Sequence, residues 1–155
     1  MPQSINESRL IENEVRLRNL RVTKETLETR RSMVRWLALS LGVINPGESR
    51  HGALAVLDAI LHFQLSAGSK EPTVEDMAGY IGEAWGPMNE KTLRYHLLQL
   101  KKAGLVENAK GRYFLAGRQQ HGLSDAPTQL TAHLSGEIDG IISNIGKVLK
   151  ELENR

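Results

Sequence analysis

Cysteine is absent from the 155-residue sequence, and its aromatic residues number only two Trp, three Tyr and two Phe. Without thiols the chain can form no disulfide, no thiolate nucleophile and no cysteine-containing zinc site. The longest uncharged apolar run, residues 36–44, is far shorter than the roughly 18 to 20 residues that span a bilayer. The N-terminal residues also lack the pattern of a secretion signal, so we expect a cytoplasmic protein with no membrane partner.

Signatures of catalysis are missing as well. No pair of His residues has the H-E-x-x-H spacing, and no glycine-rich phosphate loop is present. Asp58 and His62 lie four residues apart in an expected helix, and we interpret them as a surface pair rather than a catalytic dyad. We therefore expect no enzymatic activity, no metal and no cofactor.

Positive charge is concentrated in one part of the chain. The net charge is only +2, yet residues 87–120 contain seven Lys and Arg against two acidic residues, whereas residues 51–86 contain one against five. A local basic surface attracts polyanions even when the whole chain is nearly neutral. Residues 87–120 are therefore the first place to look for a nucleic-acid contact.

Residues 1–48 are predicted to form an N-terminal helical extension. The S-x-x-E pattern from Ser4 to Glu7 is typical of a capping box and predicts a helix over residues 5–21. A second helix is predicted after Thr23, ending at Gly42. Glu residues are interspersed among the Arg residues of this extension, and surface pairs at i, i+4 are their simplest interpretation, with an extended DNA footprint as the alternative. The Arg residues concerned are Arg16, Arg18, Arg21, Arg30, Arg31 and Arg35.

Residues 49–118 are predicted to form the central domain. An apolar helix after Arg50 is followed by a short helix over residues 74–83, capped by Thr73. Asn89 is expected to cap a third helix, residues 90–103, which carries a Leu stripe and is closed by Gly104. Two short β-prone runs over residues 105–116, joined by a polar turn, then predict a hairpin.

Residues 127–155 are predicted to form a C-terminal helix. From Leu134 onward, its apolar residues recur at the alternating steps of four and three that are typical of a coiled-coil seam. A single helix cannot bury such a stripe, so it is expected to pack on the N-terminal extension, on a second copy of the chain, or on both. The seam consists of Leu130, Leu134, Ile138, Ile141, Ile145, Val148 and Leu152.

The order helix, short helix, turn, helix and hairpin is that of a winged helix-turn-helix domain. TLRYHLLQLKKAGLV, residues 92–106, resembles the recognition helix and following strand of ArsR-type bacterial and archaeal repressors, and MAGYIG, residues 77–82, resembles their preceding helix. The resemblance implies a mainly α fold with a small β-hairpin wing, here with N- and C-terminal helical dimerisation extensions. The sequence departs from the family in its longer turn over residues 83–90 and in lacking the Cys metal-sensing motif, so metal regulation is not inherited.

The face of the 90–103 helix opposite its Leu stripe is positive and rich in hydrogen-bonding groups, and Lys110 and Arg112 are expected at the hairpin tip. Such side chains can meet base edges and phosphates. The sequence thus predicts a homodimeric regulator, associated with the nucleoid, that binds an inverted repeat in double-stranded DNA, with repression as the output by analogy. The predicted DNA-binding residues are Asn89, Lys91, Thr92, Arg94, Tyr95, Gln99, Lys102, Lys110 and Arg112.

Two other functions are compatible with the same pattern. A winged helix can serve as a protein-interaction module of transcription or chromosome machinery. Independently of the function, Tyr95 could simply cover the helix surface. A ligand-gated regulator would hold an effector between the N-terminal and C-terminal helices, although no residue pattern identifies the effector. His96, Trp36 and Trp85 are interpreted as packing residues.

Overall fold

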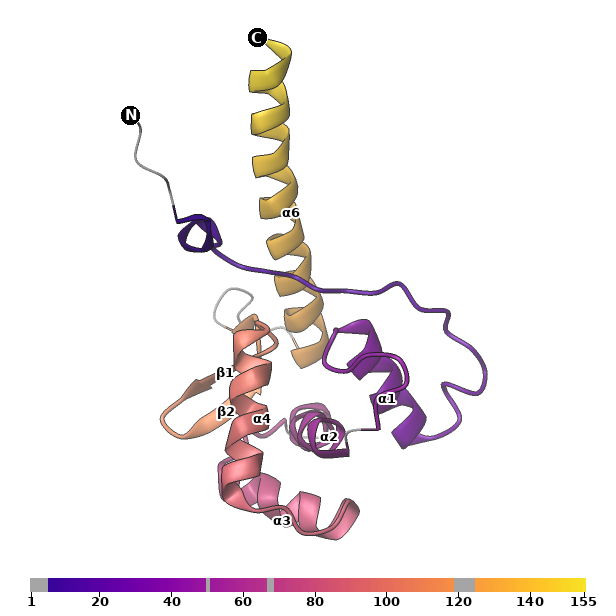
Figure 1. The fold of residues 1–155 in the computed structure, drawn as a ribbon. Coiled ribbons are helices and arrows are strands. Elements are labelled where there is room, and N and C mark those ends of the chain that lie inside the picture. Colours follow the sequence, from indigo (N-terminus) through magenta and orange to yellow (C-terminus); the bar gives the residue numbers. More distant parts are fainter. Residues whose placement is uncertain (1–5, 50, 67–68, 119–124) are drawn as a thin grey trace.

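The structure is a computed structural model that describes residues 6–49, 51–66, 69–118 and 125–155. In this part of the chain the fold is mainly helical, with one two-stranded antiparallel hairpin, a layout compatible with a winged helix (Figure 1). In chain order the elements are the 3₁₀ helix η1 (Glu7–Leu10), α1 (Arg30–Ser40), α2 (His51–Leu65), α3 (Val74–Ala84), α4 (Glu90–Lys102), β1 (Val106–Ala109), β2 (Arg112–Leu115) and α6 (Ala126–Glu153).

Helix α2 is the centre of the fold. It is apolar around most of its circumference, and a helix of that kind is stable only when other elements surround it. Helices α1, α3, α4 and α6 and strand β2 all contact it. The predicted core helix is therefore confirmed, and its buried residues are Leu54, Ala55, Val56, Leu57, Asp58, Ala59, Ile60, Leu61 and Gln64.

Capping side chains set the starts of α3 and α4 where the sequence predicts them. The Thr73 hydroxyl accepts from the Asp76 amide at 3.1 Å, and the Asp76 carboxylate accepts from the Thr73 amide at 3.0 Å. This backbone hydrogen bond lowers the pKa of Asp76. The Asn89 side chain accepts from the Thr92 amide at 2.8 Å, so α4 begins immediately after Asn89.

The predicted hairpin is also confirmed. Strands β1 and β2 pair with Val106 opposite Leu115 and Ala109 opposite Arg112, which leaves a two-residue turn. Both turn residues, Lys110 and Gly111, have positive φ angles, 52° and 74°, and turns of this kind match the right-handed twist of the strands.

The helix predicted over residues 5–21 is wrong. Of the described residues in that range, only those of η1 are helical, and Asn6 begins η1 by accepting from the Ser8 amide; Ser4 and Ile5 lie outside the described residues. Residues 11–22, which we call the N-terminal strap, have no helical turns and cross the body of the molecule (Figure 1). The helix predicted after Thr23 begins later, at Arg30, behind a capping box made by Thr29 and Ser32.

Long-range hydrogen bonds hold the strap in its extended form. The Arg18 amide donates to Ser40 O at 2.8 Å, and the Ser40 hydroxyl donates back to Arg18 O at 2.9 Å. The Arg18 guanidinium donates to Leu39 O in the last turn of α1 and to Ile44 O in the segment after it, both at 2.9 Å. The Arg18 backbone and side chain are thus committed to α1, which a local helix could not achieve.

The interpretation of the Arg residues as i, i+4 surface pairs is accordingly wrong for those whose contacts are defined. Arg16 donates to the Asn45 side chain at 2.9 Å, and Arg35 donates to Glu48 O at 3.0 Å. Arg30 and Arg31 reach other helices, as described next. These side chains connect segments of the fold instead of decorating one helix, and the DNA-footprint alternative finds no support in their contacts.

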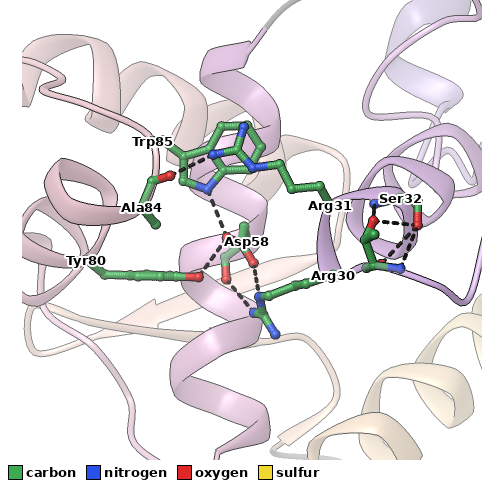
Figure 2. A network of polar contacts seen from close by, with 8 residues as sticks. Arg30, Arg31, Ser32, Asp58, Tyr80, Ala84 and Trp85 are labelled. Atoms are coloured by element: carbon green, nitrogen blue, oxygen red, sulfur yellow. Dashed lines mark hydrogen bonds and ion pairs between the residues drawn. The ribbon is translucent and has the colours of Figure 1, made fainter.

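Asp58 is the polar centre of the fold, although it was expected on the helix surface beside His62 (Figure 2). Its side chain is almost completely buried, and its Oδ1 accepts from Arg30 Nε at 2.7 Å. Its Oδ2 accepts from the Tyr80 hydroxyl at 2.8 Å and from Trp85 Nε1 at 2.9 Å. One carboxylate of α2 therefore binds α1, α3 and the turn after α3, while burial and the bond to Asp58 raise the pKa of Tyr80.

The long turn before α4 is held by the same network. The Arg31 guanidinium lies 3.7 Å from the centre of the Trp85 ring, close enough for a cation–π interaction, and donates to Ala84 O at 2.6 Å (Figure 2). Trp85 is thus fixed from two sides, by Asp58 and by Arg31. The turn is also shorter than the predicted range of residues 83–90, because α3 continues to Ala84 and only residues 85–89 connect it to α4.

We expect the Asp58→Ala substitution to lower the free energy of unfolding by about 2 to 3 kcal/mol, because Tyr80 and Trp85 lose a charged acceptor. Arg30 adds little to this loss, since its side chain is about half exposed. Urea unfolding followed by circular dichroism measures the change. Asp139→Ala, at an exposed carboxylate of α6, is the control and should cost less than about 0.5 kcal/mol. Equal effects of the two substitutions would contradict the assignment of Asp58 as a structural centre.

Candidate nucleic-acid interface

Helix α4 is oriented by the Leu stripe that the sequence predicts. Leu93, Leu97 and Leu100 are 0%, 1% and 3% exposed and lie in the core, and α4 contacts both α2 and α3. The opposite face of α4 is consequently turned outward. His96, at the edge of the stripe, packs against Gly52, where even a Cβ atom would come within 2.5 Å of His96 Nε2. Its interpretation as a packing residue is confirmed.

The first half of α4 presents three of the predicted DNA-binding side chains on its surface. Lys91, Thr92 and Arg94 are exposed. Arg94 forms an ion pair with Glu90 at 3.1 Å, one turn away. Both partners are exposed, and such surface pairs stabilise a helix by well under about 1 kcal/mol, so Arg94 can exchange this partner for another anion. Asn89 also lies here, but its side chain is engaged as the helix cap.

Three other predicted residues of α4 lie in a different environment. Tyr95, Gln99 and Lys102 line a cavity of about 570 Å³ that is also bordered by the N-terminal strap and by α6. The structure therefore divides the predicted site into two parts. One part is open at the start of α4, and the other borders a cavity between Tyr95 and the end of the helix.

The two predicted DNA-binding residues of the hairpin, Lys110 and Arg112, differ in their contacts. Lys110 is exposed at the turn, where its positive φ directs the chain back. Arg112 is exposed too, but its guanidinium donates to Glu71 O at 2.9 Å, and the neighbouring Tyr113 amide donates to Pro72 O at 2.9 Å. These bonds fasten β2 to the segment before α3. Arg112 thus helps to position the hairpin, and Lys110 is the residue at its tip.

One cation of this surface is missing from the predicted set. Lys101 is exposed and lies seven residues after Arg94, two helical turns along the same face of α4. The i, i+7 spacing was the available signal. Lys91, Arg94 and Lys101 together give this side of α4 a row of positive charge, interrupted by Leu98, whose side chain is 47% exposed.

The described residues contain no group of three or more His, Asp or Glu side chains placed to hold a metal ion. No described helix is long and apolar enough to cross a membrane.

Comparisons with protein-family models, with curated proteins and with solved structures find no match for this chain. The geometry of α3, α4 and the hairpin is therefore what bears on function.

Proposed function

We propose that the protein is a winged helix-turn-helix regulator of transcription that binds double-stranded DNA as a homodimer. The observation that carries this proposal is the arrangement of α3, α4 and the hairpin, with cations exposed at the start of α4 and at the hairpin tip. In helix-turn-helix proteins the first residues of the recognition helix meet base edges in the major groove. Lys91, Thr92 and Arg94 occupy that position, and Lys110 would meet flanking phosphates.

The resemblance of residues 77–82 and 92–106 to ArsR-type repressors supports the same function and points to repression. The fold matches the expected order of elements, and the turn after α3 is rigidly held by Asp58 and Arg31. A fixed turn favours a defined docking angle for α4. A regulator of this kind would be found with the nucleoid.

The proposed homodimer rests on an exposed apolar surface of α6. This helix projects away from the rest of the molecule (Figure 1), and only its first turns, through Leu130 and Leu134, pack against the core. Farther along, five large apolar side chains are 54% to 66% exposed, namely Ile142, Ile145, Val148, Leu149 and Leu152. A continuous apolar stripe at coiled-coil spacing is expected to pair with a copy of itself. Two-fold symmetry would then present two α4 helices to an inverted repeat with half-sites about one helical turn apart.

A protein-interaction module is the second candidate function. Leu98 and Tyr95 favour it, because both side chains are about half exposed on α4. Exposed side chains of this kind can contact a protein partner as well as a thymine methyl group in DNA.

Replacing Lys91 and Arg94 together by Gln should remove the preference for specific DNA. Gln keeps the helix propensity while it removes two positive charges, and each bidentate base contact discriminates by about 1 to 3 kcal/mol. The wild-type protein would first select fragments from genomic DNA, and competition gel shifts with scrambled fragments would then measure the preference. We expect it to fall about tenfold or more.

The matched control is Lys147→Gln with Lys150→Gln, which removes the same charge from exposed positions of α6. This variant should keep the wild-type preference. If both double variants lose binding equally, the contact is general electrostatic attraction. If wild-type protein shows no salt-sensitive DNA affinity at all, the protein-interaction function replaces the proposal.

The hairpin tip is tested by Lys110→Asn. Asn tolerates the positive φ of this turn position, so the substitution removes the charge without straining the hairpin, as Ala would. Loss of one phosphate contact should lower the slope of log affinity against log salt by about 0.9 for each protomer, equally for specific and scrambled DNA. An unchanged slope would rule out a phosphate contact by Lys110.

The dimer is tested by Ile145→Lys with Leu152→Lys in sedimentation velocity. Both side chains are more than half exposed in the single chain, so the fold should persist while the mass falls from that of two chains to that of one. Ser143→Lys, at an exposed position off the seam, is the control and should remain dimeric. A double variant that stays dimeric would show that α6 is not the main contact.

A further inference from the structure

The cavity of about 570 Å³ beside α4 is lined by segments that are far apart in sequence, namely the strap, residues 41–43, Ala53 of α2, α4 with the turn after it, and α6. The strap, α4 and α6 each form one wall. Its volume is typical of pockets that enclose a small organic molecule, about 300 to 1,000 Å³. The lining includes apolar side chains from the core side, among them Leu41, Val43, Leu100, Leu105 and Leu134.

The lining of the cavity contains more acidic side chains than Lys and Arg side chains. Three carboxylates, Glu12, Glu14 and Glu137, border the cavity, against two cations, Arg16 and Lys102. The Arg16 guanidinium is directed to the Asn45 side chain at 2.9 Å. His96 and His133 also line the cavity, and the three carboxylates outnumber the two permanent cations by one.

Glu137 is held at the junction of the strap and α6. Its carboxylate accepts from the Asn13 side-chain amide and lies 3.6 Å from His133 Nε2. The Asn13 contact ties the strap to α6 over the cavity. A carboxylate anchored in this way beside an apolar lining is a suitable counter-charge for a bound cation.

We infer that this cavity binds a small amphipathic cation, with its apolar ring or chain on the Leu and Val side chains and its positive charge among the carboxylates. Tyr95 borders the cavity as well, and its ring offers a face to a cation. The site needs no DNA. Because Tyr95, Gln99 and Lys102 belong to α4, an occupant would also contact the helix proposed to read DNA, and only this regulatory consequence rests on the proposed function.

The test uses rhodamine 6G, a lipophilic cation, and 8-anilinonaphthalene-1-sulfonate, a lipophilic anion, each titrated with the DNA-free protein and followed by fluorescence anisotropy. We expect saturable binding of rhodamine 6G at one site per chain. Glu14→Gln with Glu137→Gln should weaken it about tenfold and should not weaken binding of the anion. Glu75→Gln with Glu83→Gln, at exposed positions of α3, removes the same charge elsewhere and should leave both affinities unchanged.

A second variant separates this cavity from the exposed stripe of α6. Ala103 lines the cavity but is itself exposed, so Ala103→Trp should fill the space without disturbing the core and should abolish rhodamine 6G binding. Ile145→Lys should retain it. Non-saturable binding, tighter binding of the anion, or full affinity in Ala103→Trp would each overturn the inference. Cation binding by a protein without DNA affinity would uphold the site and refute only the proposed function.

Discussion

The buried carboxylate of Asp58 is the contact on which the arrangement of the helices depends. Burial of a charged group is unfavourable unless other groups compensate it, and here the compensating donors come from Arg30, Tyr80 and Trp85. These donors belong to α1, α3 and the turn after α3. Tyr80 and Trp85 supply most of the compensation and the half-exposed Arg30 adds to it, so the carboxylate favours one arrangement of the segments around α2.

That arrangement determines where α4 stands. The turn between α3 and α4 consists of residues 85–89, and the backbone of such a turn does not by itself define the angle between the two helices. Trp85 removes this freedom, since its indole N–H binds Asp58 and its ring lies under Arg31. Asn89 then starts α4 at a fixed residue. The exposed side chains at the start of α4 are therefore presented by a helix whose start is held by these contacts, an arrangement that the proposed sequence-specific recognition would need.

The sequence predicted α2, α3, α4, the hairpin and α6 because their signals are local. Caps such as Thr73 and Asn89, a Leu stripe at helical spacing and a two-residue turn all act within a few residues. The strap was predicted as a helix because its fate is decided by Ser40 and other residues more than twenty positions away. Asp58 was misread for the same reason, as none of its three partners lies within twenty residues of it.

The candidate site shows the same division. The exposure of Lys91 and Arg94 follows from the Leu stripe, which the sequence displays. The separate surroundings of Tyr95, Gln99 and Lys102 depend on how the strap and α6 pass the end of α4, which no local pattern encodes. Lys101 lies seven residues after Arg94, so helical spacing also places it on this surface. It is absent from the predicted set because it lies on the flank of the Leu stripe.

Helix α6 connects the two proposed functions of the molecule. Its first turns carry Leu134 and Glu137 beside the cavity, and its later turns carry the exposed apolar stripe. A continuous helix of 28 residues is about 42 Å long and moves largely as one body. In the proposed dimer, a small rotation at the cavity would therefore become a larger displacement at the far end of the helix. Because the stripe fixes that end against its partner, the displacement would instead move the two α4 helices relative to each other. An occupant of the cavity would then alter the distance between the two α4 helices, and with it the half-site spacing that the dimer fits.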